Sequence, residues 1–187
     1  TPKINQFQAL DNYLAEIQGA RILVVDDHPT NLMSVSQALE MYHCQLKMAP
    51  DGLQAVRLAE EWMPDLILLD VLMPKMDGFE VCRYLKKNPK TQEIPIIFVT
   101  AKYETHYIVE GLLCGGVDYI IKPFQVNELL TRLKTHLQMS RLARALSKKN
   151  NELLEVNQRL EAEIALRRQA EGDLKIADSQ LSSIGSH

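Results

Sequence analysis

The stretch DLILLDVLMPKMDGFEVCRYLKKNP, at residues 65–89, decides the fold. Its first part, Asp65–Leu69, is a short apolar run without polar alternation, which is typical of a strand covered on both faces. Asp77-Gly78 opens the amphipathic segment Phe79–Lys87, and Asn88-Pro89 stops it, so we expect a helix there. The stretch therefore predicts a buried strand, a loop and a helix, which is the repeating unit of α/β folds.

The same unit recurs on both sides of this stretch. Further apolar runs predict strands at Arg21–Val25, Cys44–Met48, Ile94–Val99 and Val117–Ile121. Helix signals follow at Thr30–Met41, Leu53–Trp62, Glu104–Leu113 and from Gln125 onward. This alternation predicts an α/β protein with a doubly wound, five-stranded parallel sheet that has helices on both faces. Such a sheet binds its ligand outside the carboxyl ends of the strands.

Composition excludes several classes of function. The 187 residues carry 21 basic and 24 acidic side chains, so no basic excess points to nucleic acid or to an anionic membrane. No apolar run approaches the roughly 18 residues of a membrane span, and no signal peptide is present, so we expect a cytoplasmic protein. Cys44, Cys82 and Cys114 fit no zinc spacing and no disulfide framework, and we expect small buried hydrophobes in a reducing cytosol.

Polar side chains stand where the predicted strands end, at Asp26, Asp27, Asp70, Thr100 and Lys122. We expect Thr30 to cap the helix that follows the first strand, which leaves Asp26 and Asp27 without a structural task. Carboxylates that are packed together repel one another, and a magnesium ion with oxygen ligands relieves that repulsion. The ammonium of Lys122 and the hydroxyl of Thr100 suit an anion at the same place. The pattern therefore implies a phosphoryl group held on a carboxylate.

Taken together, these residues resemble the receiver domain of two-component response regulators. The resemblance rests on LVVDD at 23–27, LLDVLMPKMDG at 68–78, VTA at 99–101 and DYIIKPF at 118–124, in the family's order and with its separations. It covers about residues 20–137 and implies a flavodoxin-like sheet of strand order 2-1-3-4-5.

The resemblance also implies a role for each site residue. Asp70 is the expected phosphoacceptor, and Lys122 is expected to pair with a phosphoryl oxygen. Magnesium is expected on Asp26, Asp27, Asp70 and the backbone carbonyl of Leu72. Thr100 and Tyr119 are the expected switch residues, and Lys122–Pro123 is an expected cis peptide. The expected phosphodonor is the phosphohistidine of a histidine kinase or of a histidine phosphotransfer protein.

The last third of the sequence has a different pattern. After Phe124 there is no proline, and the only glycines are Gly172 and Gly185. Heptads that begin with Met139 place apolar side chains in one seam, at Leu142, Leu146, Leu153, Val156, Leu160, Leu174 and Leu181. This periodicity favours a coiled coil, and we expect a parallel homodimer, although the flanking charges do not decide between parallel and antiparallel chains. The alternative is a helix that folds back on its own receiver, but residues 138–184 would span roughly 70 Å.

The domain prediction follows from these patterns. We expect a helical N-terminal extension over 1–19 with an amphipathic segment at Ile4–Gln18, a receiver over 20–137, a coiled-coil linker over 138–184 and a vector remnant over 185–187. The segment at 160–171 resembles the signalling-helix linkers that precede output domains such as kinases and cyclases. We therefore expect a non-enzymatic piece of a longer protein, in which the receiver controls an output domain that this chain lacks.

Two other functions compete with this interpretation. An aspartate-nucleophile phosphatase of the haloacid dehalogenase type needs a second aspartate two residues after the nucleophile, where Leu72 stands. A dimerisation scaffold whose receiver takes no phosphate is disfavoured by the complete set of Asp27, Asp70, Thr100 and Lys122. Labelling by a small phosphodonor, compared with an Asp70→Asn variant, separates the scaffold from the phosphorylated receiver.

Overall fold

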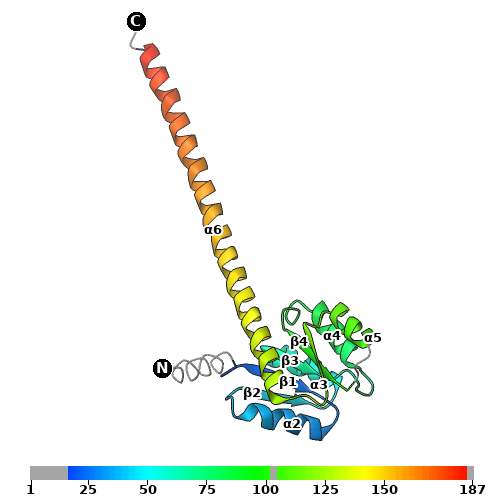
Figure 1. Cartoon of the computed structure of the whole chain (residues 1–187). Helices are drawn as coiled ribbons and strands as arrows, with labels where there is room; N and C mark the ends of the chain where they lie inside the picture. The colour runs from blue at the N-terminus through cyan, green and yellow to red at the C-terminus, as the bar shows by residue number, and fades with distance from the viewer. Residues whose placement is uncertain (1–16, 102–104, 185–187) are drawn as a thin grey trace, which may run out of the picture. The chain divides into compact units, whose positions relative to one another are not determined.

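The computed structural model describes residues 17–101 and 105–184, with the backbone alone over 179–184. The predicted helix at Ile4–Gln18 and the residues 185–187 therefore lie essentially outside the described part. Five strands form one parallel sheet in the order β2-β1-β3-β4-β5, which confirms the predicted topology (Figure 1). The strands are β1 (Arg21–Val25), β2 (Gln45–Ala49), β3 (Leu66–Leu69), β4 (Ile96–Thr100) and β5 (Asp118–Ile121).

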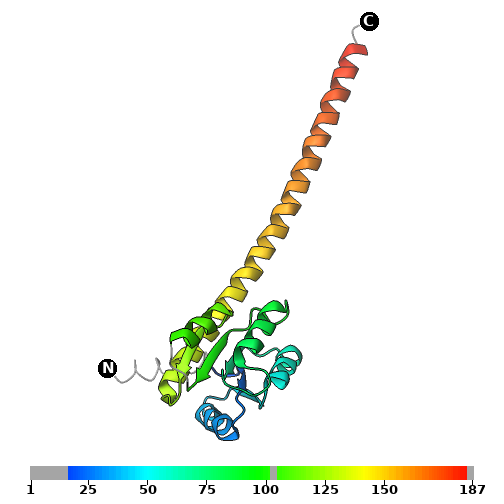
Figure 2. The same ribbon diagram turned by 90° about the vertical axis from the view of Figure 1, so that its right-hand side faces the viewer.

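Helices cover both faces of the sheet (Figures 1 and 2). They are α2 (Pro29–Glu40), α3 (Gly52–Trp62), α4 (Gly78–Lys87), α5 (Thr105–Leu113) and α6 (Val126–Ile184). One core lies under α3, α4 and α5 and contains Leu69, Phe79 and Phe98. The other core lies under α2 and the first turns of α6 and contains Leu39 and Leu133. The central strands β3 and β4 are buried along their whole length, which explains their unbroken apolar sequences.

Local signals fix where the helices begin. The Asp77 side chain accepts a hydrogen bond from the Glu80 backbone, and Glu80 returns one, so α4 starts with a complete capping box. The expected cap of α2 is wrong. His28 occupies the N-cap position, and Pro29, whose fixed φ suits the first helical residue, precedes Thr30 in the first turn.

The chain divides into two compact units, Thr1–Arg141 and Leu142–His187. The described part of the second unit is helix, and its apolar side chains, among them Leu146 and Leu153, are exposed on the single chain. Within the described residues, none of the helices combines the length and the apolarity that crossing a membrane requires.

Candidate functional site

The polar site lies at the carboxyl edge of the sheet. The register pairs Val25 of β1 with Leu69 of β3, so Asp26 and Asp70, the next residues of the two strands, leave the sheet side by side. Thr100 is the last residue of β4, and Lys122 follows β5. Because the strands are parallel, these residues meet at the same edge, as the sequence predicts.

Lys122 joins the two carboxylates. Its ammonium forms an ion pair with Asp26 Oδ2 and lies 3.6 Å from Asp70 Oδ2. The other oxygen of Asp26 accepts hydrogen bonds from the His28 backbone N–H at 2.9 Å and from the Asn31 amide at 3.0 Å. Asp26 therefore does have a structural task, contrary to the sequence-based expectation, because its carboxylate holds the loop between β1 and α2.

The carboxyl group of Asp70 is almost completely buried, and its neighbours shift its pKa in opposite directions. Burial raises its pKa above the ordinary value, the Lys122 charge opposes that rise, and the Asp26 charge adds to it. The backbone N–H groups of Val71 and Leu72 also interact with the carboxylate and favour its charged form. A further positive charge placed beside Asp70 would therefore stabilise the ionised form of its carboxylate.

A second acidic residue lies closer to solvent. Asp27 Oδ1 is 2.8 Å from Nδ1 of His28, whose ring is exposed. Ligand atoms of Asp26, Asp27 and His28 lie within 4.8 Å of one another. The two carboxylates supply the hard oxygen donors that magnesium prefers, so the donor set fits that ion. The structure thus places His28, the N-cap residue of α2, against Asp27.

The loop between β3 and α4 approaches Asp70 closely. The Gly78 N–H donates to the Val71 carbonyl at 2.9 Å. A Cβ atom at Gly78 would lie 2.2 Å from the backbone oxygen of Asp70, so this position has no room for a side chain. Lys75 takes a positive φ of 71°, which completes the turn, and the Leu72 side chain, two residues after Asp70, is half-exposed.

The two expected switch residues lie together. Thr100 is fully buried, and its hydroxyl shares a hydrogen bond with the phenol of Tyr119. Burial raises the pKa of Tyr119 to about 12, although the bond to Thr100 opposes the rise. The Tyr119 ring is itself buried and packs against Phe98, with 6.3 Å between the ring centroids.

The residues that follow β5, Lys122 and Pro123, form the remaining side of the site. The Lys122 N–H donates to the Thr100 carbonyl at 2.9 Å, and the Lys122–Pro123 peptide bond is cis. All site residues that the sequence indicated therefore lie at or near one edge of the sheet.

Fold and site together define a flavodoxin-like α/β domain with an acidic site at the carboxyl edge of a parallel sheet. The chain belongs to the response regulator receiver domain family, whose model matches residues 22–134.

Comparisons with known proteins agree with this assignment. The chain is 36% identical over 173 residues to a protein described as "Probable cyclic di-GMP phosphodiesterase" from Vibrio cholerae, covering 92% of this chain and 37% of the relative. It is 40% identical over 116 residues to the response regulator PleD of Caulobacter vibrioides, covering 62% of this chain and 26% of PleD. The chain thus spans well under half of either relative.

Among solved structures, the receiver domain of the sensor histidine kinase PA1611 from Pseudomonas aeruginosa is 32% identical. The match has a TM-score of 0.61 and covers 64% of this chain and 98% of the other. That structure is described with a magnesium ion coordinated in its active-site cleft.

Proposed function

We propose that the chain is the phosphoacceptor receiver of a two-component phosphorelay and that Asp70 accepts the phosphoryl group. The observation that carries the proposal is the position of Lys122, whose ammonium lies between the buried carboxylates of Asp26 and Asp70. A cation in this place suits a phosphoryl group that would arrive on Asp70, because it offers a point charge to the added oxygens.

The proposed reaction is transfer from a phosphohistidine of a histidine kinase or a histidine phosphotransfer protein. A carboxylate oxygen of Asp70 attacks phosphorus, the new O–P bond forms, and the N–P bond breaks with its electron pair left on the imidazole nitrogen. Lys122 and the Thr100 hydroxyl would then bind phosphoryl oxygens. The residues that would hold Mg²⁺ are Asp26, Asp27, Asp70 and the Leu72 carbonyl. The ion would shield the charge that two carboxylates and a phosphoryl group bring together.

The proposed output of the site is a shift between two conformations. Rotation of Thr100 toward a phosphoryl group would break its hydrogen bond with Tyr119. The Tyr119 ring belongs to β5, so a change there alters the face formed by α5, β5 and the first turns of α6. Phosphorylation can drive this change only as far as its preference for one of the two conformations allows.

The helix beyond the receiver suggests how the change is used. We assign the receiver to residues 20–137 and a coiled-coil linker to 138–184, which pairs with a second copy in parallel. The exposed seam supports this, since Leu142, Leu146 and Leu153 present apolar surface at heptad spacing. The alignment with the phosphodiesterase-named relative includes most of this helix, which supports an output domain attached to it.

The experiment that tests phosphoacceptance is a time course of labelling by acetyl phosphate. The unaltered chain is expected to take up label in the presence of Mg²⁺ and not in excess chelator, and Asp70→Asn is expected to take up none. The matched control is Asp77→Asn, because asparagine still caps α4 and the residue lies in the same loop. Equal labelling of the Asp70→Asn and unaltered chains would overturn the proposal and favour the unphosphorylated scaffold.

The dimer is tested separately by cysteine crosslinking. Leu153→Cys lies in the apolar seam and is expected to form a disulfide-linked dimer under mild oxidation, because equivalent seam residues face each other in a parallel pair. Asn151→Cys, on the opposite heptad face, is the control and is expected to give no more dimer than the unaltered chain. Absence of dimer with Leu153→Cys would refute the parallel coiled coil.

A further inference from the structure

Two cysteines that are 32 residues apart in sequence meet between α4 and α5. Cys82 lies on α4 and is fully buried, whereas Cys114 directly follows α5 and is partly exposed. The Cys82 thiol donates to the Cys114 carbonyl at 3.3 Å, and the Cys114 thiol donates to the Gly111 carbonyl at 3.1 Å. The two side chains also interact directly with each other. The sulfur atoms are therefore neighbours without being bonded.

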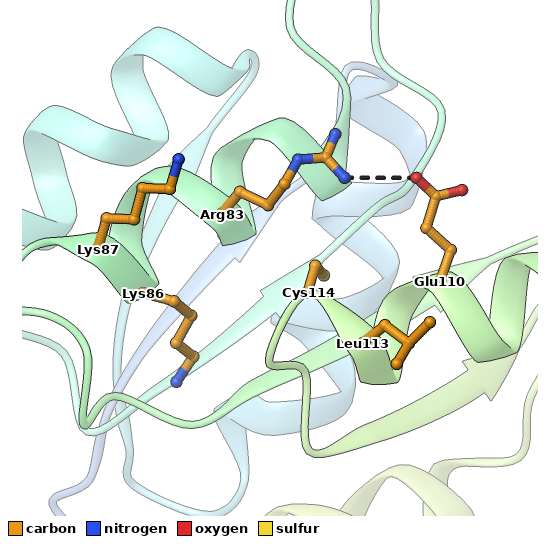
Figure 3. Close-up of a pocket in the computed structure, with 6 residues that line it drawn as sticks. All are labelled: Arg83, Lys86, Lys87, Glu110, Leu113 and Cys114. Carbon is orange, nitrogen blue, oxygen red and sulfur yellow. Dashed lines mark hydrogen bonds and ion pairs between the residues drawn. The ribbon is translucent and has the colours of Figure 1, made fainter.

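A pocket of about 290 Å³ opens beside this pair, and Figure 3 shows the side chains that line it. Its wall on α4 is basic, with Arg83, Lys86 and Lys87, and Cys114 lies across from it at the end of α5. Arg83 reaches over to Glu110 at 3.3 Å. A small molecule from solvent can thus reach Cys114 through the pocket, whereas Cys82 is fully buried and does not line it.

The surroundings make the two thiols unequal. The pKa of Cys114 lies below its ordinary value because Cys82 hydrogen-bonds to its side chain, and the Gly116 backbone and the Arg83 charge add to this effect against the opposing effect of burial. The pKa of Cys82 lies well above its ordinary value because of the same hydrogen bond and its complete burial. The thiolate is the reactive form of cysteine, so Cys114 is the member of the pair that reacts first.

We propose that Cys114 and Cys82 are an oxidisable dithiol, with Cys114 as the residue that attacks a small hydroperoxide and Cys82 as its resolving partner. The Cys114 thiolate attacks one oxygen of hydrogen peroxide, the S–O bond forms as the O–O bond breaks, and the proton that the Cys114 thiol released on ionisation converts the leaving hydroxide to water. Cys82 sulfur then displaces hydroxide from the sulfenic acid, and the Cys82 proton makes this hydroxide a second water. Two thiols thus lose two electrons to one peroxide and form one disulfide.

The disulfide would connect α4 to the turn before β5. This turn packs tightly, because Gly116 leaves no space for a side chain beside Phe98. The covalent link would hold the end of α5 against α4 and restrict how far α5 can move. This inference does not depend on phosphorylation, because it concerns the two thiols alone.

Treatment of the whole chain with hydrogen peroxide tests the proposal. We expect peptide mapping to find an intramolecular Cys82–Cys114 disulfide that dithiothreitol reverses, and amide hydrogen exchange in α5 to slow when it forms. Cys44 is the internal control, since burial raises its pKa and its thiol contacts only the Leu39 carbonyl among the described hydrogen bonds. Cys114 is expected to be oxidised about tenfold faster than Cys44.

Cysteine variants distinguish an oxidisable Cys82–Cys114 pair from a single reactive cysteine. Cys44→Ser is expected to retain the disulfide, and Cys114→Ser is expected to abolish it and leave Cys82 reduced. A Cys82→Ala chain is expected to accumulate sulfenic acid on Cys114. The proposal is overturned if peroxide oxidises Cys44 as fast as Cys114, or if the unaltered, folded chain yields no bond between the two cysteines.

Discussion

Substitution of Gly78 by alanine tests the close approach of the β3–α4 loop to Asp70, the proposed phosphoacceptor. The new Cβ atom would lie 2.2 Å from the Asp70 carbonyl oxygen, where ordinary contact begins at 3.4 Å, so the backbone must move by 3.4 − 2.2 = 1.2 Å. Overpacking of this kind costs about 2 kcal/mol, and the strained Gly78–Val71 hydrogen bond costs about 1 more. Alanine returns at most about 1 kcal/mol of helix propensity. We therefore expect a loss of about 2 kcal/mol.

The assay is urea unfolding followed by circular dichroism, together with labelling at Asp70. For a slope of about 2 kcal/mol per molar urea, the midpoint is expected to fall by about 1 M. The displaced atoms belong to Asp70, the proposed phosphoacceptor, so labelling by acetyl phosphate is expected to slow by about 10²-fold.

Gly52→Ala is the matched control for this prediction. Gly52 also follows an aspartate N-cap and begins a helix. Its added Cβ would meet side-chain atoms of Met76 and Val81 at 2.9 Å, whereas the Cβ at Gly78 would meet the backbone of Asp70. We expect a loss of about 1 kcal/mol and an unchanged labelling rate. A Gly78→Ala chain with the midpoint and labelling rate of the unaltered chain would refute the reasoning.

Two further predictions concern β5. Burial raises the pKa of Asp118, but hydrogen bonds from Arg132 and His136 outweigh this effect and bring the pKa below the ordinary 3.8. The charged Asp118 therefore stabilises the folded state above pH 3.8, and this contribution is lost as the pH falls through the folded-state pKa. Asp118→Asn is therefore expected to lower the free energy of unfolding by about 2 kcal/mol at neutral pH, and urea titrations that show the same loss at pH 3 or lower would contradict this. Tyr119→Phe removes the hydrogen bond to Thr100 and is expected to cost about 1 kcal/mol in the same assay, whereas a fully retained midpoint would mean that the bond contributes nothing.

Much of the fold could be predicted because the central strands β3 and β4 are buried on both faces. Their apolar runs stand out from the sequence, and the predicted strand Arg21–Val25 agrees with β1 at both ends. The predicted ends of β3 at Leu69 and of β5 at Ile121 also agree, and the remaining strand ends shift by one or two residues, as for β4, where Thr100 completes the strand. The cap of α2 was misassigned because Thr30 is a favourable cap by type, whereas Pro29 fits only the first helical turn.

The candidate site was predictable for a topological reason. Parallel strands place their carboxyl ends at one edge, so Asp26, Asp70 and Lys122 had to converge once the sheet was recognised. Which carboxylate pairs with Lys122 depends on side-chain geometry that no spacing encodes. The same limit hid the Cys82–Cys114 pair, because the packing of α5 on α4 brings together residues that no local pattern connects. The dimer seam and the role of each site residue remain predictions.

The central claim is that Asp70 carries the phosphoryl group, and site mapping tests it most directly. The whole chain would be incubated with acetyl phosphate and Mg²⁺, its intact mass recorded, and the adduct located by peptide mass spectrometry. The account predicts a single phosphoryl group on Asp70, which chelator prevents. No adduct, or an adduct on any other residue while Asp70 stays unmodified, would contradict it.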